Sequence, residues 1–257
     1  MEIAVTGEGP ADYGKEIYKD GIRKWEWGAA GIYIKRIAKE QNKEVTLHAI
    51  PRKNVDEIKL QRRQLQGLDG KAVPARKFAI CMQKQGYSYG IYYCDADRGS
   101  GDKNSDENVA RKRFNSVYES VRKGLEGEIN YAIPMVSLRM IENWVVADTK
   151  AFEECFGKCP EIPNKPELLW GDKNNPKSDY PKHYLQRIVR SMGKKYETIN
   201  VSSELYCEIV EQQDLNEVAK KCYISFRKFY EDFSNMLAQE GVKEMGKIGR
   251  ASCRERV

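Results

Sequence analysis

Acidic side chains follow two segments of the chain that are typical of buried β-strands. Glu8 comes directly after the largely apolar run Glu2–Thr6, between two glycines in the segment TGEGPAD. Asp95 and Asp97 come directly after the apolar run Tyr89–Cys94, in the segment YYCDADRG. Because side chains two residues apart in an extended segment point the same way, we expect Asp95 and Asp97 to face one site.

These two motifs meet if the strands that precede them are neighbours in a parallel sheet. Glu8, Asp95 and Asp97 then supply three oxygen donors to one place. Carboxylates without a nearby histidine suit Mg²⁺ or Mn²⁺, and such a cation offsets their mutual repulsion. It also polarises a phosphate oxygen and helps to generate hydroxide from water. The alternative is that Glu8 caps a helix and that the Asp pair forms an Asx turn.

Other common catalytic and binding motifs are absent from the sequence. The two histidines, His48 and His183, fall in unrelated segments, so no Ser–His–Asp or Cys–His arrangement is predicted. The motif GxxxxGK followed by Ser or Thr is absent, so ATPase activity is not expected. No cysteine pair has CxxC spacing, which argues against a zinc site and fits reduced thiols.

Segments with strand and helix patterns alternate along residues 1–148. Apolar runs predict strands at 2–6, 45–50, 89–94 and 129–133. Helical periodicity predicts helices at 27–38, 75–85, 106–123 and 139–147. This alternation predicts an α/β fold, with a mostly parallel sheet flanked by helices. In such a sheet, functional side chains collect beyond the carboxyl ends of the strands.

The second half of the chain is predicted to be a helical C-terminal appendage. Helical patterns recur at 150–157, 165–170, 181–191, 214–221 and 223–238. Five prolines between residues 160 and 181 keep these helices short. We therefore expect an α/β domain, residues 1–148, and a helical region, residues 149–247, that packs on it.

The last ten residues, Ile248–Val257, are interpreted as foreign to the fold. They read IGRASCRERV and resemble the translation of a sequencing-library adapter, so they are left out of the fold prediction. A disordered basic tail is the alternative. Without them the chain has 41 basic and 37 acidic residues, a net charge of +4. This mild excess permits nucleic-acid binding without arguing strongly for it.

Neither a membrane-spanning segment nor a signal peptide is predicted. No run approaches 18 apolar residues. The chain opens directly into the strand-like MEIAV, without the pattern of a signal peptide. We therefore expect a cytoplasmic protein that does not contact a membrane.

The acidic motifs resemble those of the Toprim fold, the metal-binding domain of topoisomerases, primases and OLD-type nucleases. That family carries a Glu after its first strand, in an EGxxD-like turn, and a DxD pair after its third. Glu8–Asp12 (EGPAD) and Asp95–Asp97 (DAD) match both motifs in the same order. The resemblance implies that Glu8 is a general base or a metal ligand, and that Asp95 and Asp97 are metal ligands.

A closer resemblance is to the Toprim-like bacterial family DUF4276, and it extends from Glu2 to about Leu237. That family shows an EGPTD-like motif, a DxD and a segment like MIENWVVAD, which is Met140–Asp148 here; PELLW and CYISFRKF are also similar. The resemblance implies that Glu142 is a further acidic member of the site, although a structural role is an equal alternative. Ala11 stands where the family often has Thr, which removes a possible capping hydroxyl. A partner ATPase and a role in phage defence are also implied.

These observations together predict a metal-dependent nuclease of the Toprim type that hydrolyses DNA or RNA. The candidate contacts to nucleic acid, all basic, are Arg98, Arg111, Lys112 and Arg113. The alternative is a Toprim-like module that binds a partner ATPase or nucleic acid without catalysis. A HAD-type phosphatase fits less well, because it leaves Glu8 unexplained and needs its DxD after the first strand.

Overall fold

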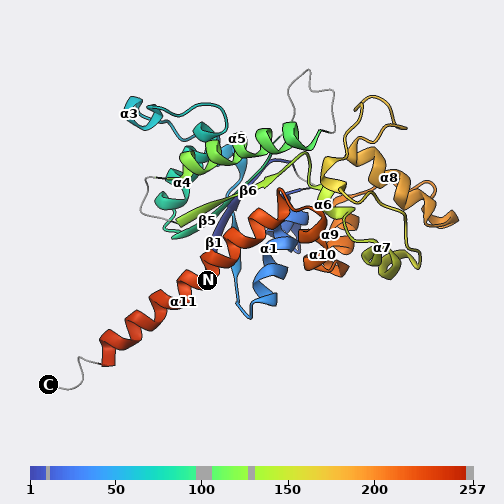
Figure 1. The fold of residues 1–257 in the computed structure, drawn as a ribbon. Coiled ribbons are helices and arrows are strands. Elements are labelled where there is room, and N and C mark those ends of the chain that lie inside the picture. The colour runs from blue at the N-terminus through green and yellow to red at the C-terminus, as the bar shows by residue number, and fades with distance from the viewer. Residues whose placement is uncertain (10–11, 97–105, 127–130, 253–257) are drawn as a thin grey trace.

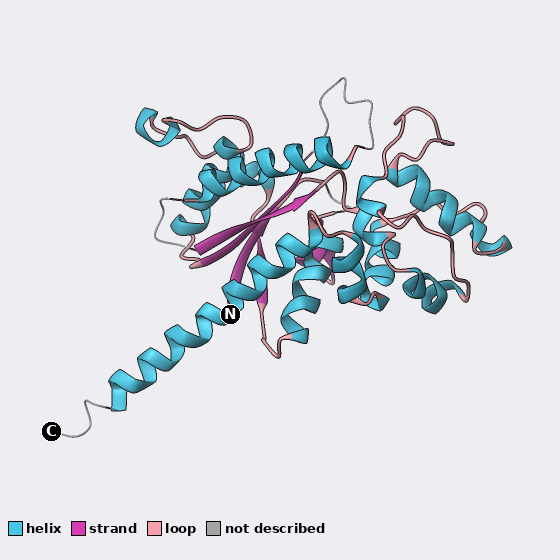
Figure 2. Ribbon diagram, in the orientation of Figure 1, coloured by secondary structure: helices cyan, strands magenta, loops and turns pink. Residues whose placement is uncertain are grey.

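The computed structural model describes residues 1–9, 12–96, 106–126 and 131–252, and their side chains as far as residue 239. A sheet of four parallel strands forms its centre (Figure 1). In spatial order the strands are β4 (Thr46–Ala49), β1 (Glu2–Thr6), β5 (Tyr89–Asp95) and β6 (Tyr131–Ser137). Helices cover both faces of this sheet (Figure 2). The predicted α/β class is therefore confirmed.

Alternate side chains of the central strand β5 enter two separate hydrophobic cores. Tyr93 packs with α1 (Ala29–Glu40) on one face, and Tyr92 packs with α4 (Ala72–Lys84) and α5 (Glu107–Leu125) on the other. The chain reaches β4 on one side of β1 and then crosses to β5 on the other side. The order in which strands are added to the sheet therefore reverses between β1 and β5. Open parallel sheets bind ligands at such a point, beyond the carboxyl ends of the strands.

A β-hairpin that the sequence patterns did not predict lies between β1 and α1. Its strands, β2 (Gly14–Lys19) and β3 (Ile22–Trp27), pair antiparallel through the two-residue turn Asp20–Gly21. Both turn residues have positive φ, 56° and 75°, as an Asp-Gly hairpin turn requires. The hairpin escaped prediction because its strands are mostly exposed and carry no continuous apolar face.

Some predicted elements end elsewhere in the structure. The strand expected to stop at Pro134 continues to Ser137, because β6 is an edge strand, where proline is tolerated. The helix expected at 139–147 shortens to α6 (Glu142–Val145). Between β4 and α4, where no element was predicted, the chain forms α2 (Arg52–Asp56) and α3 (Arg62–Leu65), and α3 projects from the body (Figure 1).

Beyond β6, the described part of the chain is helical and contains no strand. In order, the elements after α6 are α7 (Thr149–Phe156), η1 (Pro166–Leu168), α8 (Pro181–Ser191), η2 (Lys194–Tyr196), α9 (Ser203–Gln212), α10 (Leu215–Lys221) and α11 (Phe226–Ser252). No helix was predicted where α9 lies. The backbone of α11 continues to Ser252, into the segment Ile248–Val257 that was interpreted as foreign to the fold. None of the helices described here combines the length and apolar composition needed to cross a membrane.

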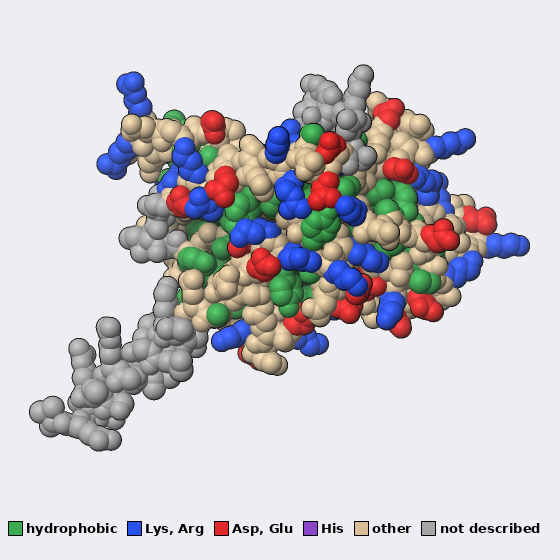
Figure 3. Space-filling view, in the orientation of Figure 1, with side chains coloured by type: hydrophobic (Ala, Val, Ile, Leu, Met, Phe, Trp, Pro, Cys, Tyr) green, Lys and Arg blue, Asp and Glu red, His purple; other side chains and the backbone are tan. Residues whose placement is uncertain are grey.

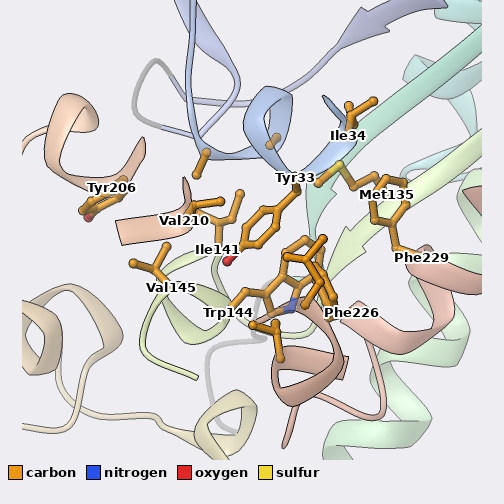
Figure 4. Close-up of a cluster of buried hydrophobic side chains, with 14 of the residues drawn as sticks. Tyr33, Ile34, Met135, Ile141, Trp144, Val145, Tyr206, Val210, Phe226 and Phe229 are labelled. Carbon is orange, nitrogen blue, oxygen red and sulfur yellow. The ribbon is translucent and has the colours of Figure 1, made fainter. Parts of the chain in front are cut away.

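The helical region and the sheet share one hydrophobic core. Tyr33 of α1, Trp144 of α6 and Phe226 of α11 contact one another edge to face, with ring centroids 5.1 to 5.7 Å apart (Figure 4). The Trp144 indole donates a hydrogen bond to Ser225 Oγ at 2.8 Å, and Ser225 Oγ donates to the buried carboxylate of Glu167 at 2.9 Å. Residues from the C-terminal region therefore complete the core of the α/β region.

Because of this shared core, we expect a fragment that ends at Asp148 to lose its cooperative fold. The fragment exposes Tyr33 and Trp144, and burying one large aromatic side chain contributes about 2–3 kcal/mol. The full chain is expected to unfold in a single transition. Urea unfolding followed by tryptophan fluorescence and by circular dichroism checks both points. A cooperative transition in the fragment would contradict the shared core.

Candidate functional site

Three acidic side chains gather beside the carboxyl end of β5, on the face of the sheet that α1 covers. They are Asp12, from the segment after β1, Asp95, the last residue of β5, and Glu142, the first residue of α6. The charges of Glu142 and Asp95 both act on Asp12. Since β1, β5 and β6 are neighbours, the sheet brings the segments that follow them to one edge.

Asp95 is held by two hydroxyl groups from the sheet itself. Tyr93 Oη donates to Asp95 Oδ1 at 2.7 Å. Ser137, the register partner of Asp95 on β6, donates to the same oxygen. The pairing of β5 with β6 therefore fixes the position of this carboxylate.

Glu142 is fully buried and is held by the C-terminal region. Its Oε1 accepts a hydrogen bond from Tyr206 Oη of α9 at 2.8 Å and lies 3.5 Å from Lys182 Nζ of α8. Burial acts to lower the pKa of Lys182, but the charges of Glu142 and Asp12 raise it above its ordinary value. Lys182 therefore stays protonated and offsets part of the negative charge.

Asp12 is the acidic residue whose protonation the cluster changes most clearly. Its side chain is almost entirely buried. Burial, followed by the charges of Glu142 and Asp95, raises the pKa of Asp12 to about 8, although Lys182 and the Tyr93 hydroxyl act to lower it. Asp12 therefore keeps its proton at neutral pH unless a further cation offsets these charges.

Two buried oxygens of the cluster, Asp12 Oδ1 and Glu142 Oε2, have no hydrogen-bond partner among the described residues. Leaving a buried acceptor without a partner costs about 1–3 kcal/mol. Mg²⁺ binds carboxylate oxygens, often only one or two, and keeps several waters. The two oxygens therefore fit a hard divalent cation held in this way. Within the described ranges, however, no group of three or more His, Cys, Asp or Glu side chains is placed to hold a metal ion.

Glu8 lies at the same edge of the sheet, but its carboxylate has other neighbours. Lys71 Nζ lies 3.1 and 3.2 Å from its two oxygens, and Arg52 Nη1 lies 3.4 Å from Oε1. Arg52 Nη1 also donates to Tyr92 Oη at 3.2 Å, on the face covered by α4 and α5. Of the predicted acidic set, the structure thus joins Asp95 with Glu142 and turns Glu8 toward two cations.

Asp97 and Arg98, both predicted site residues, lie outside the described residues. Their contribution to the predicted site stays a prediction. Of the two aspartates of the DxD motif, Asp95 is the one that the structure describes.

The basic run on α5 divides into residues with different surroundings. Arg111 pairs with Glu107 at 3.0 Å, and Lys112 is exposed. Arg113 Nε donates to the backbone oxygen of Ala96 at 2.9 Å. Arg113 therefore fastens the backbone directly after Asp95, a positioning role that its place in a basic run did not indicate.

Three residues of the cluster were not among the predicted site residues. Asp12 had a signal, because it ends the EGPAD motif that also contains Glu8. Lys182 and Tyr206 had none, because they come from α8 and α9, about 40 and 60 residues after Glu142. Only the packing of the helical region on the sheet brings them to the site.

The fold and this cluster together define a class: an α/β protein whose parallel sheet carries buried acidic side chains at its carboxyl edge. A lysine and a tyrosine from the C-terminal helices compensate part of that acidity. Comparison of the chain with protein-family models, with curated proteins and with solved structures found no match.

In metal-free solution, stability is expected to fall as the pH rises from about 4 to about 8. The unfolded chain releases the Asp12 proton near its ordinary pKa of 3.8, whereas the folded protein, with Glu142, Asp95, Lys182 and Tyr93 around Asp12, holds it to about 8. Between these values the folded state binds more protons, so raising the pH favours unfolding, by at most about 1.4 kcal/mol per pH unit.

Asp12→Asn is expected to make this pH dependence shallower, because the amide does not titrate. Urea unfolding of both proteins in EDTA between pH 5 and pH 8 checks this. Glu167, whose pKa burial raises to about 7 against hydrogen bonds that lower it, contributes equally to both proteins. Equal slopes for the two proteins would contradict the assignment to Asp12.

Tyr206→Phe is expected to lower the free energy of unfolding by about 1–3 kcal/mol, because Glu142 loses its hydroxyl donor while remaining buried. Tyr184→Phe is a matched control, since the Tyr184 hydroxyl makes only a 3.4 Å contact with the backbone of Glu161 near the surface. Chemical denaturation measures both losses. Losses of equal size would show that the Tyr206 hydroxyl is not a support of Glu142.

Proposed function

We propose that this protein is a nuclease of the Toprim type, which hydrolyses phosphodiester bonds with Mg²⁺ or Mn²⁺. The observation that carries the proposal is the pair of buried oxygens without a partner, Asp12 Oδ1 and Glu142 Oε2, beside Asp95. Their position at the carboxyl edge of a parallel sheet, next to the reversal between β1 and β5, is where such sheets bind ligands.

The residues of the cluster have distinct parts in this proposal. Asp12 and Glu142 would hold the cation through these two oxygens, with Asp95 adding negative charge beside them. The cation would supply Lewis-acid polarisation of a phosphodiester oxygen. Tyr93 and Ser137 orient Asp95, since both donate to its Oδ1. Tyr206 orients Glu142.

Lys182, the cation that the C-terminal region adds to the cluster, would act on the approaching substrate. Its ammonium group lies against Glu142 with the side chain about half exposed. It therefore offsets negative charge that would otherwise repel an approaching phosphate.

A non-catalytic module that binds a partner ATPase or nucleic acid is the second candidate. The observation that favours it is the charge compensation already present: Lys182 lies against Glu142, and Arg52 and Lys71 lie against Glu8. Because Glu142 and Glu8 already face cations of the chain, these two carboxylates have less need of a metal ion. A partner ATPase and a role in phage defence belong to either candidate as implications of the family resemblance.

Plasmid cleavage with Mg²⁺ or Mn²⁺ separates the two candidates. Wild type is expected to cut, and Asp95→Asn is expected to lower the rate by at least about 100-fold, since it removes one charge without changing the side-chain shape. Asp69→Asn, in an exposed loop, is the matched control and is expected to cut like wild type. Circular dichroism verifies that each variant is folded.

Two other outcomes decide against the nuclease. Equal cutting by wild type and Asp95→Asn would mean that the activity comes from elsewhere. No cutting by wild type, together with an unchanged melting temperature on addition of Mn²⁺, would favour the binding module.

A further inference from the structure

The β2–β3 hairpin is rigid at its base. Tyr13, Trp25 and Trp27 pack there with ring centroids 4.8 to 6.1 Å apart. Gly14 permits the close approach, because a Cβ there would lie 2.3 Å from the backbone oxygen of Glu26. A two-stranded hairpin alone is marginally stable in water, so this aromatic base is what holds the hairpin in shape.

The outer half of the hairpin stands free in solvent. Every residue from Tyr18 to Lys24 is exposed. Tyr18 and Ile22, at 74% and 59%, are the two most exposed large hydrophobic side chains among the described residues. The register places Tyr18 and Ile22 on opposite faces of the hairpin, so an element that enters a groove presents an apolar side chain to each wall.

The charges on this half are mostly positive. It has three basic residues, Lys19, Arg23 and Lys24, and one acidic residue, Asp20. Lys19 and Lys24 have no ion-pair partner within the described part of the chain, whereas Arg23 lies 3.7 Å from Glu16. The register pairs Lys19 with Ile22 and Ile17 with Lys24, so both lysines point to the same face of the hairpin as Ile22.

The hairpin also begins at the acidic cluster. Asp12 directly precedes Tyr13 and β2, and its backbone oxygen accepts a hydrogen bond from Ala30 N at the start of α1, directly after β3. The exposed half of the hairpin begins six residues after Asp12, so a duplex bound there lies within about 20 Å of Asp12.

We propose that the β2–β3 hairpin binds double-stranded B-form DNA by entering its major groove, an inference that rests on the proposed function and names its substrate. A two-stranded ribbon fits this groove, which is about 12 Å wide and 8.5 Å deep. The outer half has two exposed residues in β2 and three in β3, which extend about 7 to 10 Å and so match the depth. The major groove of double-stranded RNA is deep and narrow and does not admit such an element.

The basic run on α5 lacks this combination. On the face shown in Figure 3, Lys and Arg side chains alternate with Asp and Glu. Arg111 is paired with Glu107, and Arg113 holds the backbone of Ala96. Compared with the described residues of this run, the hairpin joins lysines without an ion pair to exposed apolar side chains on an element that begins at the cluster.

Fluorescence anisotropy of a labelled 20-base-pair duplex, in EDTA so that no metal-dependent cleavage occurs, tests the proposal. Lys19→Gln with Lys24→Gln is expected to weaken DNA binding by about 10-fold and to reduce the salt slope of log affinity by about 2. The matched control, Arg62→Gln with Arg63→Gln, removes two charges from α3, which buries no residue, and is expected to change affinity by less than about 2-fold.

A third variant and two other nucleic-acid probes, measured in the same assay, identify what the hairpin contacts. Tyr18→Ser is expected to weaken binding without changing the salt slope, because it removes apolar contact and no charge. An RNA duplex of the same sequence is expected to bind at least about 10-fold more weakly than the DNA duplex. Single-stranded DNA is also expected to bind more weakly than the duplex.

Several results would overturn the proposal. Equal losses for the hairpin and α3 variants would mean that binding depends only on net charge. Equal or tighter binding of the RNA duplex would exclude major-groove entry, and no binding of wild type to any duplex would leave the hairpin to a protein partner.

Hairpin-dependent binding without cleavage in Mg²⁺ or Mn²⁺ refutes the nuclease and not this inference. Cleavage that is indifferent to the hairpin variants refutes this inference and not the nuclease.

Discussion

Glu142 places a carboxyl group where no solvent reaches it, and its position requires support from distant parts of the chain. Burying a charged group is costly unless it is paired and hydrogen-bonded. Tyr206 donates to one of its oxygens and Lys182 lies beside the same oxygen, so α8 and α9 must be docked for Glu142 to be tolerated. The acidic cluster and the C-terminal helices are therefore one structure rather than a site and an appendage.

The segment that carries Glu142 is fixed on both sides by buried polar contacts. Asn143 donates to the backbone oxygen of Pro166 at 2.6 Å, and the Trp144 indole donates to Ser225. Glu167 in turn accepts hydrogen bonds from the backbone nitrogens of Ile224 and Ser225, just before α11 begins. Hydrogen bonds of this kind specify one arrangement in a core that apolar packing alone would leave less defined.

The sequence patterns predicted the parts of the fold that have a buried periodic face. The strands at Glu2–Thr6 and Tyr89–Asp95 are enclosed by helices, so their apolar runs were informative. The β2–β3 hairpin was missed because its strands are mostly exposed, and α9 was missed although three of its residues are buried. Local pattern is weakest where burial depends on a partner that is distant in the sequence.

The candidate site was predictable to a similar degree, and for a similar reason. Asp95 follows the strand predicted at 89–94, and Glu142 falls in a segment that resembles a known family, so both were predicted. Glu8 was predicted with them, but Arg52 and Lys71, from the connection between β4 and α4, determine its surroundings. Lys182 and Tyr206 were out of reach because no local pattern links them to Glu142.

Pro134 has a consequence for how the sheet ends. It lies within β6, the edge strand, and a proline has no backbone N–H to offer to a further strand. Helix α11 also packs along β6. Growth of the sheet by addition of another chain is therefore blocked on this side, and only the short strand β4 at the opposite edge offers backbone groups for such pairing.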